Sequence, residues 1–71
     1  MHRYRITIGG GLGRIARQAF EEFTIESSGR HTSLIADLDQ AALHGVLIRI
    51  QSLGLELIEL SRMSMEAADR R

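Results

Sequence analysis

The segment of this sequence best suited to bind a ligand is a glycine-rich stretch that runs from Gly9 to Arg14. Two of its residues and the alanine beyond them, Gly11, Gly13 and Ala16, have the G-x-G-x-x-A spacing between an expected strand and an expected helix. Free backbone N–H groups at a helix start, together with the helix dipole, favour an anion. We predict a candidate anion site of four residues, Gly10, Gly11, Gly13 and Arg14. The competing interpretation is a flexible loop that needs a positive φ, beside solvated arginines.

A dinucleotide is excluded as the ligand of this stretch. The chain has 71 residues, too few for the remaining strands and helices of a dinucleotide-binding fold. The next expected strand also continues into a hairpin instead of a second crossover. Any ligand of the glycine-rich stretch is therefore expected to be a small anion.

Other catalytic and metal-binding constellations are missing from the sequence. The chain contains no cysteine, which excludes a thiolate nucleophile, a disulfide framework and a cysteine metal site. It contains no asparagine either, so no side-chain amide of that type is available to a catalytic site. The three histidines, His2, His31 and His44, have neither i, i+4 spacing nor carboxylates at metal-ligand offsets. No Gly-x-Ser-x-Gly nucleophile elbow occurs. We therefore expect no enzyme, no metal and no cofactor.

The charge balance argues against nucleic acid as a partner. Nine arginines oppose nine acidic residues, so the formal net charge is zero. The aromatic residues, Tyr4, Phe20 and Phe23, are all assigned to the core side and not to an exposed stacking platform. The apolar runs are far shorter than the ~20 residues that span a bilayer, and no secretory signal is visible. We expect a cytoplasmic protein without a membrane partner.

Periodicity predicts the elements of the first half. Residues 3–8 alternate, with Tyr4, Ile6 and Ile8 on one side, as in a half-buried strand. From Leu12 to Phe23, apolar residues recur at helical spacing, with Leu12, Ile15, Ala16, Ala19, Phe20 and Phe23 on one stripe. Residues 23–27 and 30–36 are expected to form a hairpin around Ser28-Gly29. In that register, Phe23 faces Leu34 and Glu26 faces His31.

The second half contains the strongest helix signal. Asp39 is a good N-cap residue, the buried stripe is expected to hold Leu43, Val46, Leu47, Ile50 and Leu53, and Gly54 stands where a left-handed C-terminal residue belongs. Residues 55–62 are predicted to be a last strand, with apolar residues on both faces. We expect one domain over residues 1–62 and a frayed polar tail over 63–71.

The order strand, helix, strand, strand, helix, strand predicts an α+β fold. One compact solution is the ferredoxin-like βαββαβ plait, a four-stranded antiparallel sheet of order 4-1-3-2 with two helices on one face. The first helix is the weakest element because it is short and follows glycines. If it does not form, the alternative is a ββ(β)αβ sheet with one main helix.

Residues 39–57, Asp-Gln-Ala-Ala-Leu-His-Gly-Val-Leu-Ile-Arg-Ile-Gln-Ser-Leu-Gly-Leu-Glu-Leu, resemble the C-terminal half of a group of small uncharacterised actinobacterial proteins. These proteins also begin with a strand like Tyr4–Ile8 and a glycine. The resemblance implies a small cytoplasmic domain and no particular activity. In architecture alone the chain is similar to ACT domains, which pair side by side and bind small ligands near the first strand–helix loop.

Size predicts self-association. A chain this short buries only ~60% of its unfolded surface, so its own core stabilises it weakly. We expect a homodimer or higher oligomer, formed through the open sheet face or through the edge of strand 23–27 or 55–62, with another protein as the alternative partner. The candidate contact residues are Arg5, Glu26, Ile35, Leu57 and Glu59. Gly45, in the middle of a helix, predicts a close neighbour, either the first helix or a partner chain.

Overall fold

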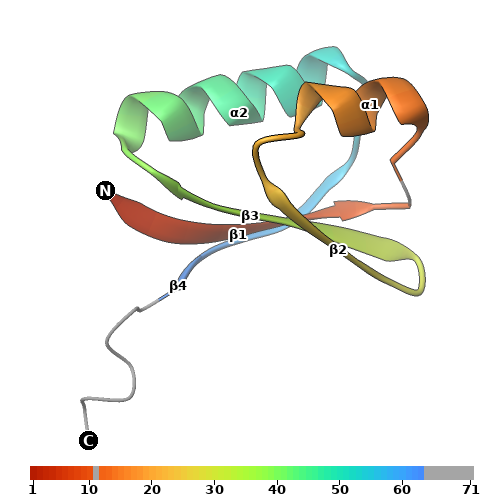
Figure 1. Cartoon of the computed structure of the whole chain (residues 1–71), viewed down its shortest axis with the longest axis horizontal. Helices are drawn as coiled ribbons and strands as arrows, with labels where there is room; N and C mark the ends of the chain where they lie inside the picture. The colour runs from red at the N-terminus through yellow and green to blue at the C-terminus, as the bar shows by residue number, and fades with distance from the viewer. Residues whose placement is uncertain (11, 64–71) are drawn as a thin grey trace, which may run out of the picture.

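A computed structural model describes residues 1–10 and 12–63. These residues form six elements, β1 (His2–Gly9), α1 (Arg14–Ala19), β2 (Thr24–Ser28), β3 (His31–Leu38), α2 (Gln40–Ser52) and β4 (Leu57–Met63). The element order and the α+β class confirm the sequence-based prediction, and α1 is formed. Both helices lie over the same face of the sheet (Figure 1). Met63, predicted to begin the polar tail, is instead the last residue of β4, and residues 64–71 lie outside the described part.

The four strands form one antiparallel sheet in the order β2-β3-β1-β4. Read from the opposite edge, this is the order 4-1-3-2. The first strand is therefore central, with β3 on one side and β4 on the other, while β2 and β4 are the two edges. The face away from the helices is referred to below as the open face.

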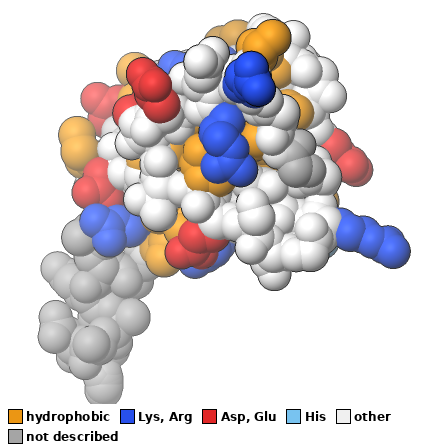
Figure 2. Space-filling view, turned by 45° about the vertical axis from the view of Figure 1, so that its right-hand side comes forward, with side chains coloured by type: hydrophobic (Ala, Val, Ile, Leu, Met, Phe, Trp, Pro, Cys, Tyr) orange, Lys and Arg blue, Asp and Glu red, His pale blue; other side chains and the backbone are white. Residues whose placement is uncertain are grey.

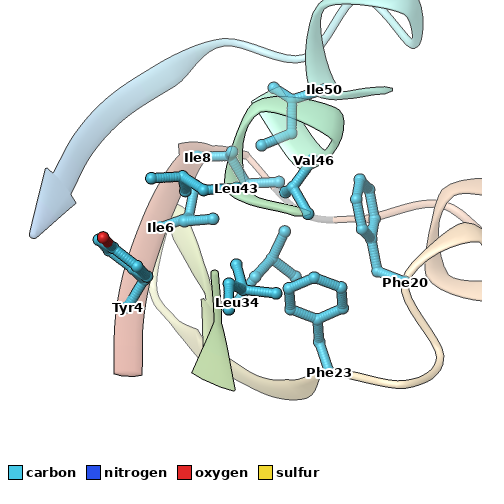
Figure 3. Packing of buried hydrophobic residues seen from close by; sticks show 10 residues of the cluster. Tyr4, Ile6, Ile8, Phe20, Phe23, Leu34, Leu43, Val46 and Ile50 are labelled. Atoms are coloured by element: carbon cyan, nitrogen blue, oxygen red, sulfur yellow. The ribbon is translucent and has the colours of Figure 1, made fainter. Parts of the chain in front are cut away.

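The core lies between the sheet and the helices. Alternate residues of β1, Tyr4, Ile6 and Ile8, are buried as predicted, because successive side chains of a strand point to opposite faces. They pack with Leu34 of β3 and with the α2 stripe of Leu43, Val46 and Ile50 (Figure 3). The rings of Phe20 and Phe23 meet edge to face, with centroids 5.6 Å apart. The interior is thus apolar apart from the buried Thr32.

Both ends of α2 are closed by the residues that the sequence indicated. The Asp39 carboxylate accepts a 2.8 Å hydrogen bond from the Ala42 N–H, as an N-cap residue does. At the other end, Gly54 has φ +73° and its N–H donates to Gln51 O at 3.0 Å. The Leu55 N–H donates to Ile50 O at 3.1 Å, which completes a Schellman motif. The predicted stripe is confirmed except at its end, where Leu53 is exposed.

The first helix is shorter than predicted and buries less. It spans six residues and none of them is fully buried. Ile15, expected in the core, is 75% exposed, whereas Phe20, just after the helix, is completely buried. The reason is that a helix of less than two turns can direct only a narrow stripe at the sheet. Ala16 and Ala19 occupy that stripe and Ile15 lies to its side.

The hairpin turn lies one residue later than expected, so each residue of β2 faces a partner two positions further along β3. Ile25 faces Leu34 and Glu26 faces Ser33, so the predicted pairs Phe23–Leu34 and Glu26–His31 are wrong. The turn residues are Gly29 and Arg30, and Gly29 takes φ +60°, which glycine adopts without strain. A shift by two leaves every side chain on its predicted face. Alternation alone therefore cannot distinguish the two registers.

A β-bulge changes the facing of β4. Thr7 pairs with Glu59, but Ile8 pairs with Leu57, so Ile58 is the additional residue. Leu57 therefore shares the helix-covered face with Ile8, although alternation predicts that it shares the open face with Glu59. The predicted position of Leu57 is wrong because a bulge reverses the facing of all residues beyond it.

The predicted close neighbour of Gly45 is absent from the described residues. Apart from the adjacent residues and the backbone of its own helix, no atom of residues 1–10 and 12–63 lies within 4 Å of the position that a Gly45 Cβ would take. Gly45 is exposed, as are Ala41 and Ala42, because α2 turns this side away from the sheet. The prediction that α1 contacts Gly45 is therefore wrong. A partner chain is the one predicted neighbour of Gly45 that stays a prediction.

Candidate functional site

The glycine-rich loop places its residues at the junction of β1 and α1. Gly10 has φ +76°, which agrees with the expected positive φ, and Gly13 precedes the helix with φ −73°. Arg14 is the first residue of α1 and is exposed. Gly11 lies outside the described residues. The described residues of the predicted anion site, Gly10, Gly13 and Arg14, therefore all belong to the junction of β1 and α1. The first turn of α1 holds no acidic residue that would repel an anion.

The backbone of Gly10 is committed to contacts inside the protein. Its N–H donates a 2.5 Å hydrogen bond to Arg30 O, and its carbonyl accepts a 2.9 Å bond from the buried Thr32 hydroxyl. The neighbouring Gly9 N–H donates to Glu56 O at 2.9 Å. Because these amide groups are already paired, they tie the loop to the hairpin and to β4. An anion at this loop would have to use groups closer to α1.

The open face is dominated by ion pairs between strands, one joining β1 to the adjacent β3 and one reaching from β1 across β3 to β2. The Arg3 guanidinium Nε donates to Asp37 Oδ1 at 2.8 Å, and Arg5 Nη1 lies 3.4 Å from Glu26 Oε1. The hydrogen bond from Arg3, reinforced by its charge, lowers the pKa of Asp37, although partial desolvation opposes this. The same contact raises the pKa of Arg3. Both arginines of β1 therefore have acidic partners within the chain.

A depression of about 600 Å³ lies on this face and extends around the edge of β3. Its lining on the open side comprises Arg3, Arg5, Thr24, Glu26, Ile35, Asp37 and Met63. The depression forms because β2 begins only at Thr24, which lies opposite Ile35. The last three residues of β3 therefore have β1 as their only strand neighbour among the described strands. The lining carries charges of both signs. Figure 2, which views the molecule from the side and not onto the open face, shows both basic and acidic side chains on the surface that it presents.

The predicted contact residues fall into two groups. Arg5 and Ile35 pair across β1 and β3, Glu26 is bound to Arg5, and Glu59 pairs with Thr7, so these four share the open face. Leu57 lies on the other face because of the bulge. The structure thus brings four of the five candidates together and separates the fifth from them.

A second surface is the free edge of β4, one of the two strand edges that the sequence suggested for association. Three of its large apolar side chains are partly open to solvent, with Leu57 45%, Ile58 44% and Leu60 39% exposed. No other strand of the described residues pairs with this edge. We call these three residues together with the free backbone of β4 the β4 edge.

An apolar groove of about 300 Å³ adjoins the β4 edge on the helix side. It is lined by Leu47, Ile50, Gln51, Leu55 and Leu57. The groove forms because α2 packs over the centre of the sheet and leaves β4 uncovered, as the exposure of Leu60 opposite the buried Ile6 shows. Apolar side chains at an unpaired strand edge are a common mark of association between chains.

Within residues 1–10 and 12–63, no three His, Asp or Glu side chains gather closely enough to hold a metal ion. In the same part of the chain, neither helix has the length and apolar character required to cross a bilayer. The surface features available in the structure are therefore the open face, the glycine-rich loop and the β4 edge.

Comparison with known proteins supplies a family. No curated protein and no solved structure was found to match the chain. A family model matches residues 3–61, a range that begins in β1 and ends within β4 and so includes both helices and the two edge strands. The chain belongs to the family described as a domain of unknown function, DUF8691.

Proposed function

We propose that this protein is a non-enzymatic module of the ferredoxin-like type that associates with itself through the β4 edge. The βαββαβ order with both helices on one face supports the fold assignment. The observation that carries the functional proposal is the partial exposure of Leu57, Ile58 and Leu60 along an unpaired strand. A small core gains stability when such a strand finds a partner.

The β4 edge is favoured over the other edge of the sheet. The edge strand β2, Thr-Ile-Glu-Ser-Ser, is two residues shorter and carries mostly polar side chains. Short, charged edges are typical of strands that avoid pairing. The longer and more apolar β4 is therefore the better surface for a second chain.

The open face is a weaker candidate for the same role. Arginines that meet glutamates across a two-fold axis would favour association there, but Arg3 and Arg5 already have their acidic partners in the same chain. Exposed ion pairs of this kind stabilise a fold only weakly, because solvent screens them. A partner at this face would have to displace or extend them, whereas a partner at the β4 edge covers free backbone and apolar side chains.

Sedimentation velocity over a dilution series from high to low micromolar concentration tests the proposal. We expect a dimer or larger species for the native chain and a monomer for Leu60→Arg. Ser27→Arg, on the β2 edge, is the matched control and should leave the oligomer intact. Circular dichroism verifies that each variant is folded. A folded native monomer throughout the series would contradict the proposal.

A second candidate is an ACT-like sensor of small anions at the loop from Gly9 to Arg14. Its support is that the N-terminus of α1 has no side-chain cap and is followed by the exposed Arg14. It ranks second because both backbone groups of Gly10 are bound internally. A thermal-shift screen of amino acids, nucleotides and phosphate tests it, since ligand at a hundredfold excess over Kd stabilises a protein by ~2.7 kcal/mol. No shift, or a shift that persists in Arg14→Ala, would eliminate it.

A further inference from the structure

We propose that the partner at the β4 edge is a second copy whose β4 pairs antiparallel with the first, with the two-fold axis passing at Leu60. This inference rests on the proposed function and specifies its geometry. It begins from the position of β4, which has β1 on one side and no strand of the described residues on the other. Alternate residues of such a strand direct N–H and C=O groups outward, where another strand can bind them.

Symmetry restricts the pairing. Two identical strands that pair antiparallel in one continuous sheet are related by a two-fold axis perpendicular to that sheet. Residues opposite one another must then point to the same face, so the axis passes at a residue and not between two residues. Both helix layers consequently lie on one side of an eight-stranded sheet, and both open faces lie on the other.

Charge removes two of the possible registers. In the bulge-free part of β4, Glu59 to Met63, an axis at Glu59 places two carboxylates opposite each other. An axis at Arg62 places two guanidinium groups opposite each other. Like charges directly opposite on neighbouring strands are destabilising. Within the interior of the strand, registers centred on Leu60 and on Ser61 remain.

Side-chain chemistry favours Leu60 over Ser61. With the axis at Leu60, this side chain meets its own copy on the helix side, where it is 39% exposed in the single chain. On the open face, Glu59 then stands opposite Ser61 of the second copy, so a hydroxyl can donate to a carboxylate twice by symmetry. With the axis at Ser61, Leu60 would instead face Arg62 and Glu59 would face Met63. At the centre of the seam, Glu59 to Ser61, the Leu60 register pairs apolar with apolar and polar with polar, whereas the Ser61 register places Leu60 against a charge.

The free surface around this seam is consistent with the register. Leu57 and the groove beside α2 lie on the same helix-covered face as Leu60, since Leu57 pairs with Ile8 and Leu60 with Ile6. A second copy in this orientation brings its own Leu60 to that face. Around Leu60 the proposed seam is therefore apolar on the helix side and hydrogen-bonded on the open side, with Arg62 flanking it on the helix side.

Cysteine cross-linking tests the register, and the native chain has no cysteine to interfere. Oxidised Leu60→Cys should form a covalent dimer in most of the molecules, because opposed residues of antiparallel strands approach to the distance that a disulfide spans. To keep Leu60 intact, Glu59→Cys and Ser61→Cys chains are also mixed. The mixture should cross-link at least severalfold more than either variant alone. Ser27→Cys on the β2 edge is the matched control and should stay monomeric under denaturing electrophoresis.

The outcomes separate the register from the proposed function. If the native chain sediments as a dimer but, of the single variants, only Ser61→Cys cross-links, the Leu60 axis is wrong while association through the β4 edge stands. If Ser27→Cys cross-links best, the seam lies at the β2 edge and both proposals are wrong. If the native chain sediments as a monomer and no variant cross-links, both proposals fail. Cross-linking by Leu60→Cys and by the mixed pair, in a chain that sediments as a dimer, supports both.

Discussion

The guanidinium of Arg49 donates a 2.6 Å hydrogen bond to the carbonyl oxygen of Ala19, the last residue of α1. The same group lies over the Phe20 ring, with Cζ 5.3 Å from the centroid, and Nη1 is 3.4 Å from Glu22 Oε2. One side chain of α2 therefore closes the end of α1 through a hydrogen bond to an otherwise free helix carbonyl. This contact, together with the buried Phe20 ring, holds in place a helix that has no buried residue of its own.

Arg49→Met should lower the free energy of unfolding by about 1–2 kcal/mol, because a charged hydrogen bond and a cation–π contact are lost from a partly exposed group. Amide hydrogen exchange should accelerate in α1 more than in α2. The measurements are urea unfolding and exchange followed by NMR. Glu22→Gln is the control and should change stability by less than about 1 kcal/mol, since its ion pair is long and exposed. Equal effects of the two variants would contradict the role of the Ala19 carbonyl.

Substitutions at Phe20 and at Ile15 should differ sharply in their effect on stability, although the sequence assigns both residues to the same helical stripe. Phe20→Leu should destabilise by about 1–3 kcal/mol, because it removes part of a fully buried ring. Ile15→Ala should change the free energy of unfolding by no more than about 0.5 kcal/mol, since that side chain is 75% exposed. Thermal and urea unfolding measure the change in unfolding free energy for each of the two variants. A large loss for Ile15→Ala would mean that a partner covers α1.

Gly45→Ala should stabilise the protein by about 0.5–1 kcal/mol. The new methyl group enters open space, and alanine loses less backbone entropy than glycine in a helix. Gly29→Ala is the opposing control, because its φ of +60° disfavours a side chain and should cost about 1 kcal/mol. Urea unfolding at several protein concentrations is the measurement. Destabilisation by Gly45→Ala that grows where the protein associates would place a partner chain against Gly45.

The Arg3–Asp37 pair should make stability depend on pH in a defined direction. The hydrogen bond from Arg3 lowers the pKa of Asp37 in the folded chain below its unfolded value of about 4. The stabilisation is therefore complete above that unfolded value and is lost as the pH falls through the folded pKa. The difference in unfolding free energy between the native chain and Asp37→Asn should shrink from neutral pH to about pH 3. A constant difference over this range would show that the Asp37 charge plays no part.

The sequence by itself determined the elements, most of the faces and the ends of α2. Alternation in residues 3–8 predicted the buried side of β1, because a strand has period two. Asp39 and Gly54 predicted the two ends of α2, because capping depends on residues next to each other in the chain. The glycine-rich loop was likewise located correctly between β1 and α1. Each of these features depends on local interactions, so a short window of residues contains the information.

Only the tertiary structure decided how these elements are aligned. The hairpin register differs from the expected one by two residues, a shift that leaves every side chain on its predicted face. The bulge at Ile58 moves Leu57 to the helix side, and no residue type marks it in the sequence. The arginines of the open face find acidic partners in strands distant in sequence. These outcomes depend on which long-range pairs form together, and therefore on the packing of the whole chain.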